Sequence, residues 1–409
     1  MIDMLVLNIP FKDEYCVEVY NKKHDRHNYV VPIRSLPVTL SAKECTILAN
    51  GELNVGRLST NFESLPSSYS NMAMKVYNDG LNSDAYVCIK CSPSKLLQGH
   101  NVYGINCFKK AARNMLAILA VSNSRLYSML DIRFTEVSEF DLTYSTQLAN
   151  EKTKMLVLDH LSRTSGGQTK NRGSNYATTV YWGAKNSRLK RLKAYSKYEE
   201  VENDISNLDP KKDGHKIEIL ESIKNTEFCK NALRFEATLK KRYLQRMGIP
   251  INLFSFLQYV EQNTDFNNVM WKTAFKDVFK SLGGQTIKMI NDDNIFAAIR
   301  KTHSSYNSKG VENLTKVNRI YSNYQVMKSL GYQHMKAITS DRTFYRYVKE
   351  LKESGFSQSF LQNLNSETGS IVVPVLHLVE IDFSKQHPKD YLQPEDLKLF
   401  GDKVSYIAA

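Results

Sequence analysis

Apolar and polar residues alternate with a period of two in three segments of the chain, and each alternation separates an apolar face from a face of ionisable residues. Along residues 139–144, Glu139, Asp141 and Thr143 share one face. Along residues 233–240 the polar face carries a second group, which consists of Arg234, Glu236, Thr238 and Lys240. A period of two is the geometry of a β-strand, so both segments predict strands with one buried face. A polar face that is merely solvated would give the same pattern.

The third segment, residues 180–197, predicts a β-hairpin with a basic second strand. The predicted turn lies at Asn186 and Ser187, and one face of the second strand carries Arg191, Lys193, Tyr195 and Lys197. A tyrosine flanked by cations is poorly placed for a core and well placed to contact a phosphate. Stacking of this tyrosine on a nucleobase is the alternative.

Apolar residues recur at helical spacing in other parts of the chain. A strand over residues 85–91 is followed by a helix over 108–121, most of the chain beyond residue 250 is helical in pattern, and 371–383 return to a strand composition. These patterns predict an α+β fold. We expect a domain over residues 1–247 with a central, mostly antiparallel sheet and flanking helices, followed by a largely helical domain over 248–409.

One of the predicted helices, over residues 342–355, resembles the recognition helix of helix-turn-helix proteins. Ser340 and Asp341 precede it as a cap, and Arg342 and Arg346 are its candidate DNA contacts. The alternative is an ordinary amphipathic helix, because its apolar residues also share one face: Phe344, Val348 and Leu351.

Composition narrows the class of partner. The 409 residues carry 55 Lys and Arg against 42 Asp and Glu, a net charge of +13, which favours a polyanion such as nucleic acid. With 42% hydrophobic residues the chain is globular in composition, and its longest apolar run, residues 115–121, is too short to cross a bilayer. We therefore expect a cytoplasmic protein with no membrane partner, and an anionic membrane surface is the weaker alternative to nucleic acid.

The polar faces become chemically meaningful if they line one sheet. Asp141 and Glu236 would then lie near Tyr195, and two carboxylates can hold Mg²⁺ or Mn²⁺ while leaving sites for phosphate oxygens. Nearby cations would favour the phenolate that a tyrosine nucleophile requires. Attack by tyrosine would keep the phosphodiester energy in a phosphotyrosine and permit rejoining, whereas attack by water would only cut.

The motifs around these residues resemble a known family. Tyr181-Trp182-Gly183, Tyr195-Ser196-Lys197 and the segment 233–240 are similar to the core of rolling-circle replication initiators, especially those of staphylococcal plasmids. A closer resemblance, over nearly the whole chain, is to the gene II replication endonucleases of filamentous bacteriophages. The motifs that recur there in the same order are FESLP at 62–66, SPSK at 92–95, LQGHN at 97–101, GQTK at 167–170, LF at 253–254 and VP at 373–374.

The resemblance implies an enzyme that nicks the viral strand at a double-stranded origin, then cleaves and recircularises the displaced viral single strand in the host cytoplasm. By position, Tyr195 is the nucleophile and Lys197 its phosphate-binding or proton-transfer neighbour. Asp141 and Glu236 match acidic metal positions, and His100 is the candidate for a single histidine in place of the two-histidine motif of related relaxases. A structural, hydrogen-bonding His100 is the alternative. Host helicase and single-strand DNA-binding protein are implied partners, and Met289 would allow a shorter product.

Two departures from the plasmid pattern leave the metal ligand set open. Glu139 stands where the plasmid initiators have arginine, and Ser145 stands where they have a second acid. The cations expected to contact DNA around the tyrosine are Arg191, Lys193, Arg234 and Lys240. Two rival functions remain, namely a non-catalytic protein that binds origin or single-stranded DNA, and a metal nuclease that activates water.

Overall fold

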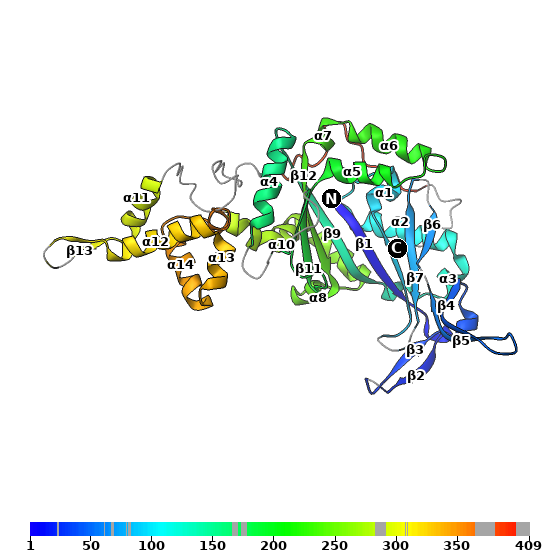
Figure 1. Ribbon diagram of the computed structural model, residues 1–409. Coiled ribbons are helices and arrows are strands. Elements are labelled where there is room, and N and C mark those ends of the chain that lie inside the picture. Colours follow the sequence, from blue (N-terminus) through cyan, green and yellow to red (C-terminus); the bar gives the residue numbers. More distant parts are fainter. Residues whose placement is uncertain are drawn as a thin grey trace.

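An eight-stranded antiparallel sheet forms the centre of the protein (Figure 1). The computed structural model describes all residues except 23, 61, 67–68, 79, 81–82, 166–170, 173–177, 283–291, 307, 309, 365–380 and 398–409. The strand order is β10-β11-β12-β9-β1-β8-β7-β6. These strands are β1 (Ile2–Pro10), β6 (Glu63–Pro66), β7 (Asn71–Tyr77), β8 (Tyr86–Cys91), β9 (Glu136–Gln147), β10 (Thr179–Trp182), β11 (Lys190–Ser196) and β12 (Ala232–Lys240). The predicted α+β class with a mostly antiparallel sheet is confirmed.

Other paired strands of the described residues lie outside this sheet. They form the hairpins β2 (Val17–Asn21) with β3 (Arg26–Val30), β4 (Leu40–Ile47) with β5 (Leu53–Thr60), and β13 (Ser305–Tyr306) with β14 (Glu312–Asn313). The helices that surround the sheet are α1 (Pro93–Gln98), α2 (Phe108–Ser122), α3 (Ser124–Ser128), α4 (Glu151–Arg163), α5 (Lys197–Ser206), α6 (Gly214–Lys224), α7 (Glu227–Lys230), α8 (Lys241–Arg246), α9 (Leu253–Gln262) and α10 (Phe266–Leu282). Three 3-10 turns are η1 (Asp13–Tyr15), η2 (Ile33–Ser35) and η3 (Ile132–Phe134).

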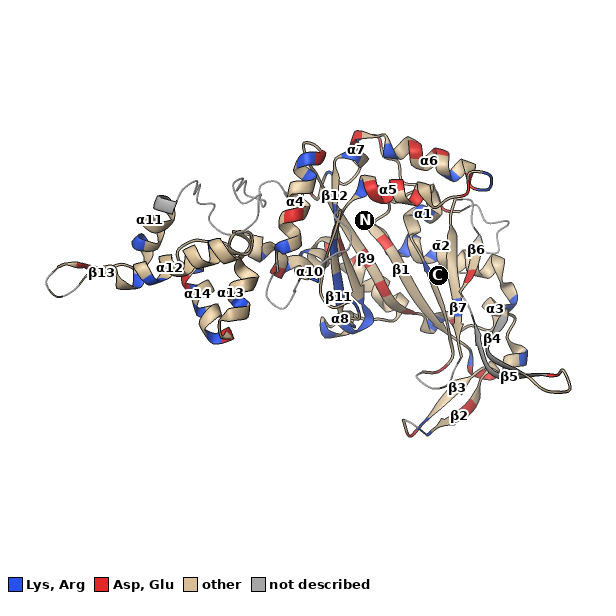
Figure 2. Ribbon diagram, viewed as in Figure 1, with Lys and Arg blue, Asp and Glu red and all other residues tan. Residues whose placement is uncertain are grey.

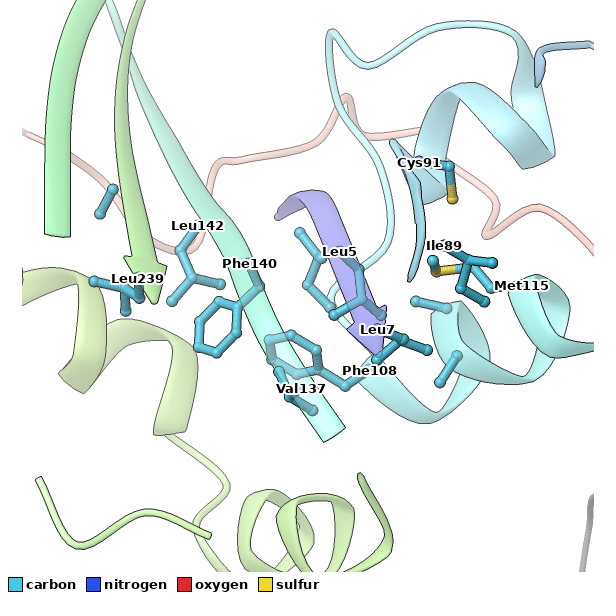
Figure 3. Close-up of a cluster of buried hydrophobic side chains, with 14 of the residues drawn as sticks. Leu5, Leu7, Ile89, Cys91, Phe108, Met115, Val137, Phe140, Leu142 and Leu239 are labelled. Atoms are coloured by element: carbon cyan, nitrogen blue, oxygen red, sulfur yellow. The ribbon is translucent and has the colours of Figure 1, made fainter. Parts of the chain in front are cut away.

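One face of the sheet is the main hydrophobic core. Phe140 of β9 is fully buried and its ring lies 4.9 Å from that of Phe108 on α2, which in turn lies 5.0 Å from Phe256 on α9. Figure 3 shows side chains of this core gathering from the sheet and from α2. Because the alternation in the strands directs every second side chain into this core, the other face of the sheet is left polar.

Helices α9 and α10, which follow residue 247, pack on the same core. Leu253 and Phe256 of α9 and Trp271 of α10 belong to it, and the Trp271 indole donates to the Phe235 carbonyl at 3.2 Å. A second, separate cluster of buried residues spans 295–361. Its helices are α11 (Asp292–His303), α12 (Thr315–Leu330), α13 (Tyr332–Ile338), α14 (Asp341–Glu353) and α15 (Gln358–Gln362). The proposed domain boundary between residues 247 and 248 remains a prediction.

The C-terminal segment 381–397 returns to the sheet. The strand expected over 371–383 is not observed in its described part, because residues 381–383 are irregular, and 371–380 lie outside the described residues. Instead, the Phe383 ring packs 4.8 Å from that of Tyr144 at the end of β9. Met289 and the motifs at 167–170 and 373–374 also lie outside the described residues. Within the described part of the chain, no helix is both long and apolar enough to span a membrane.

Candidate active site

The sheet register brings the predicted polar residues onto one face. Glu236 of β12 is paired on one side with Lys193 of β11 and on the other with Thr143 of β9. Tyr195 lies two residues from Lys193 on β11, and Asp141 lies two residues from Thr143 on β9, so both side chains project from the same face as Glu236, in the rows on either side of it. The three alternating segments therefore form neighbouring strands, as the sequence suggested, and Tyr195, Glu236 and Asp141 share one polar face.

Tyr195 is enclosed by charged groups. Its side chain is only 3% exposed, its hydroxyl donates to Glu236 Oε2 at 3.2 Å, and Lys193 Nζ lies 4.4 Å from the ring centroid. Burial, reinforced by the negative charges of Glu200 and Glu236, raises the pKa of Tyr195 well above its usual value of 10. The expectation that surrounding cations favour phenolate is therefore wrong for this state, because desolvation and carboxylates outweigh the lowering by Arg234.

The two predicted carboxylates share one electrostatic environment. Burial and then the charge of Glu236 raise the pKa of Asp141 well above 3.8. Burial likewise raises the pKa of Glu236, although Lys193, whose Nζ lies 3.0 Å from Glu236 Oε2, opposes the shift. Asp141 Oδ1 is enclosed and has no hydrogen-bond partner in the described structure. An orphaned carboxylate oxygen beside a second carboxylate is a donor set that fits a hard divalent cation.

Asp3 is a third carboxylate that the sequence reasoning missed. The register of β1 against β9 shifts between Ile2 and Met4, and the bulged residue is Asp3, which is 7% exposed. Burial raises its pKa, but the charges of Arg234 and Lys197 prevail and lower it, and Asp3 itself raises the pKa of both Asp141 and Glu236. The sequence signal for this carboxylate was Asp3 itself, the one acidic residue in the mostly apolar strand β1.

His100 does not join the carboxylates. Its ring lies edge-on to Tyr103 at 4.8 Å, and its Nδ1 lies 3.4 Å from Gln98 Nε2. Burial, followed by the charges of Lys197 and Arg234, lowers its pKa to about 4. Across the described residues, no three His, Cys, Asp or Glu side chains form a metal-binding group. The structure thus brings Asp141 and Glu236 together without adding His100 to them.

Arg234 and Lys197 hold the loop that follows His100. Arg234 is 2% exposed and donates to the carbonyls of Asn101, at 2.5 Å, and Val102. Lys197 was expected on the strand face beside Tyr195, but β11 ends at Ser196, and Lys197 begins α5 as a fully buried residue. Its ammonium donates to Asn101 Oδ1 at 2.8 Å and pairs with Glu200. Burial lowers the pKa of Lys197 to about 8, with Glu200 opposing this shift.

Comparison with known proteins places the chain in a family. Residues 1–265 match the family model described as the N-terminal part of a replication-associated protein, and residues 306–397 match the model of the C-terminal part of the same protein. This chain belongs to that family of phage replication-associated proteins. The resemblance to the filamentous-phage family is confirmed, whereas the relation to staphylococcal plasmid initiators remains a prediction.

Several relatives in this family match nearly the whole chain. It is 34% identical over 427 residues to the replication-associated protein of Salmonella phage IKe, with all of both chains covered. The protein of the same name from Enterobacteria phage M13 is 34% identical over 408 residues, which cover 96% of this chain and 99% of the relative. That of Enterobacteria phage I2-2 is 26% identical over 74% of this chain. The N-terminal family model spans every residue gathered around Tyr195.

The remaining predicted DNA contacts of this replication-associated protein fall into two places. On the sheet, Arg191 and Lys240 both pair with Glu139, at 3.2 and 3.5 Å, so part of their charge is neutralised. Figure 2 shows acidic and basic residues along β9 and β11. Arg342 and Arg346 are exposed on α14, within the second cluster. The apolar face of α14 packs inward through Phe344, Val348 and Leu351, as the amphipathic alternative predicts. Contact of the opposite face with DNA remains a prediction.

The C-terminal segment contributes a residue next to the site that the sequence did not reveal. Gln386 accepts from the Ser145 backbone amide at 2.8 Å and donates to the Ser145 carbonyl at 2.9 Å. Ser145 lies opposite Arg234 in the sheet register, and its hydroxyl accepts from Arg234 Nε at 3.3 Å. Residues near the end of the chain therefore brace the strand that carries Asp141.

Proposed function

We propose that this protein is a site-specific DNA endonuclease with strand-joining activity, which initiates and terminates rolling-circle replication of a filamentous phage genome. The observation that carries the proposal is the Tyr195 hydroxyl bonded to Glu236 on the polar face of the sheet, beside Asp141. The relatives are named replication-associated proteins, and a net charge of +13 suits DNA as the substrate. The partners that we infer are origin duplex and the displaced viral strand, with host helicase and single-strand DNA-binding protein in the host cytoplasm.

In the nicking step, the Tyr195 oxygen attacks the scissile phosphorus and its proton passes to Glu236, whose Oε2 already accepts the hydroxyl hydrogen. The bond between the Tyr195 oxygen and phosphorus forms as the bond to the 3′-oxygen breaks, and that oxygen takes a proton from solvent water and leaves as a 3′-hydroxyl. Because burial raises the pKa of Glu236, this carboxylate is a stronger base than an exposed glutamate. Lys193, bound to the same carboxylate, would also neutralise a phosphate oxygen.

Divalent metal fits the same site. Asp141 and the Glu236 oxygen that does not contact Tyr195 would hold Mg²⁺ or Mn²⁺, which would polarise the scissile phosphate, and Oε2 of Glu236 would remain the acceptor of the Tyr195 proton. Asp141 Oδ1 is enclosed without a partner, and burial, followed by the charge of Glu236, raises the pKa of Asp141; a bound cation would relieve both of these costs. His100 would then position the loop that Arg234 holds.

Rejoining is the chemical reverse. A 3′-hydroxyl attacks the phosphotyrosine and gives its proton to solvent water, the phosphodiester re-forms, and the Tyr195 oxygen leaves and recovers its proton from Glu236. Since the phosphotyrosine conserves the energy of the original bond, this step consumes no nucleotide.

The test is incubation of the protein with supercoiled origin DNA and Mg²⁺, followed by detection of nicked DNA and of a protein–DNA adduct. Tyr195→Phe should abolish both products. Tyr198→Phe is the matched control, because it removes a hydroxyl three residues away on α5, and it should nick normally. If nicking survives Tyr195→Phe and no protein–DNA adduct forms, the result would favour a metal nuclease that activates water. Binding without any nicking by the unaltered protein would favour the non-catalytic alternative.

A further inference from the structure

The polar face of the sheet continues well beyond the candidate active site. Val6 of β1 is paired with Glu139 on one side and with Lys90 of β8 on the other, so the row of side chains that contains Lys240 and Glu139 reaches Lys90. On the next strand, Lys75 lies opposite Cys88, and Tyr77 lies opposite Tyr86. Neighbouring strands lie about 4.8 Å apart, so Lys90 is roughly 10 Å across the sheet from Glu139.

The side chains at this end of the face are aromatic and cationic. Phe62, just before β6, is 46% exposed, and the ammonium groups of Lys90 and Lys75 lie 4.5 and 5.3 Å from its ring centroid. The Tyr77 and Tyr86 rings stack with centroids 4.8 Å apart and planes 12° from parallel. We call these five residues the β7–β8 stripe.

The charge of the stripe differs from that of the active-site half of the face. Arg191, Lys193 and Lys240 all pair with carboxylates. Lys75 and Lys90, in contrast, form no ion pair with any carboxylate of the described residues, and the partners of their ammonium groups are aromatic rings. Cations without a carboxylate partner beside an exposed ring complement a phosphate and an unstacked base, whereas the bases of a duplex are already stacked on one another.

We propose that the β7–β8 stripe is a binding site for single-stranded DNA, in which Phe62 stacks on a base while Lys75 and Lys90 bind the flanking phosphates. The inference rests on the proposed function, since it extends the path of the nicked strand from Tyr195 across the same sheet face. The stripe lies on the strands farthest from β10, so one bound strand would cross β1 between stripe and tyrosine. The stripe would hold the strand in register while the tyrosine acts.

The experiment measures binding of a fluorescently labelled oligothymidine by anisotropy, using the full chain with Tyr195→Phe, over about 50 to 200 mM salt. Each phosphate contact on a single strand contributes a slope of about −0.7 in log affinity against log salt. The double variant Lys75→Gln/Lys90→Gln should therefore reduce the magnitude of the slope by about 1.4. Lys152→Gln, which removes an exposed cation from α4 on the core side of the sheet, should leave affinity and slope unchanged.

The aromatic contact is tested separately. Phe62→Leu keeps an apolar side chain but removes the ring, and it should weaken binding by about fivefold or more with the slope retained. Phe62→Tyr should bind as the parent does. Parent-like affinity and slope in both the lysine variant and Phe62→Leu would overturn the inference. So would a loss of affinity for a duplex of the same length that equals the loss for the single strand. Nicking of supercoiled origin DNA by the same variants with Tyr195 intact is scored in parallel, so that failure of the stripe is distinguished from failure of the nuclease proposal.

Discussion

Replacement of Asp141 by asparagine should stabilise the fold while disabling the chemistry. The folded state raises the pKa of this carboxyl, chiefly by burial and then by the charge of Glu236. A carboxyl whose pKa is raised on folding costs the folded protein free energy at a pH where the group is ionised in the unfolded chain. Asparagine is nearly the same size and carries no charge, so Asp141→Asn should raise the free energy of unfolding at pH 7 by about 1–2 kcal/mol.

The pH dependence has a definite sign. An acid whose pKa is raised in the folded state stabilises the fold only while it is protonated, and that contribution is lost as the pH rises from the ordinary value of 3.8 through the raised one. Asp141→Asn should therefore exceed the parent in stability above this window and lose its advantage below it. Urea unfolding at a series of pH values, with the difference taken between parent and variant, measures the effect.

The catalytic consequence should be opposite. Loss of a carboxylate that holds the metal should slow nicking by at least about a hundredfold, since metal stabilisation of the transition state is worth several kcal/mol. Affinity for origin DNA should be unchanged or slightly tighter, because a negative charge has been removed. Asp141→Asn that nicks normally, or that loses binding and nicking equally, would refute the assignment of this carboxylate to catalysis.

Three further predictions follow from the site. Arg234→Ala should destabilise the fold by about 3–5 kcal/mol in urea unfolding, because it leaves buried carbonyls and Asp3 without their cation. The control Arg242→Ala, at an exposed position on α8, should change the free energy of unfolding by less than about 0.5 kcal/mol. Similar values for the two variants would contradict a buried structural role of Arg234. Because the pKa of Lys197 is lowered to about 8, the free energy of unfolding of the parent should rise as the pH increases from 8 to 10.5, and it should rise more than in Lys197→Met. Parallel curves of unfolding free energy against pH for the two proteins would contradict this prediction. Chelation with EDTA should stop nicking but leave DNA binding intact, and added Mg²⁺ or Mn²⁺ should restore nicking. Nicking that persists in EDTA would exclude the metal role of Asp141 and Glu236.

The strands of the site were predictable because their pattern is local. Alternation along β9 and β12 correctly separated the apolar face, where Phe140, Leu142, Phe235 and Leu239 are fully buried, from the polar face. The prediction of a single buried face was wrong for β12, because Arg234 and Glu236 on its polar face are buried as well. The hairpin of β10 and β11 was likewise predicted from its turn and its basic second strand. These predictions succeed because the direction of a side chain on a strand depends only on its position in the chain.

Predictions that depended on the environment of a group were less successful. Lys197 continued the alternation of β11 in the sequence, but the strand ends one residue earlier, and the ammonium turns inward to Asn101 and Glu200. The direction of the Tyr195 pKa shift was missed because the burial of the ring and the approach of Glu236 depend on residues far away in the sequence. Desolvation and Coulomb energy depend on what surrounds a group in space.

The sequence by itself determined the family, the fold class and the strands that present tyrosine and carboxylates on a polar face. The tertiary structure alone decided which strands are neighbours, and hence that Glu236 contacts Tyr195, that a bulge brings in Asp3, and that Gln386 braces Ser145 from 241 residues away. Periodicity is written along the chain, whereas register and long-range contact depend on how separate segments pack together.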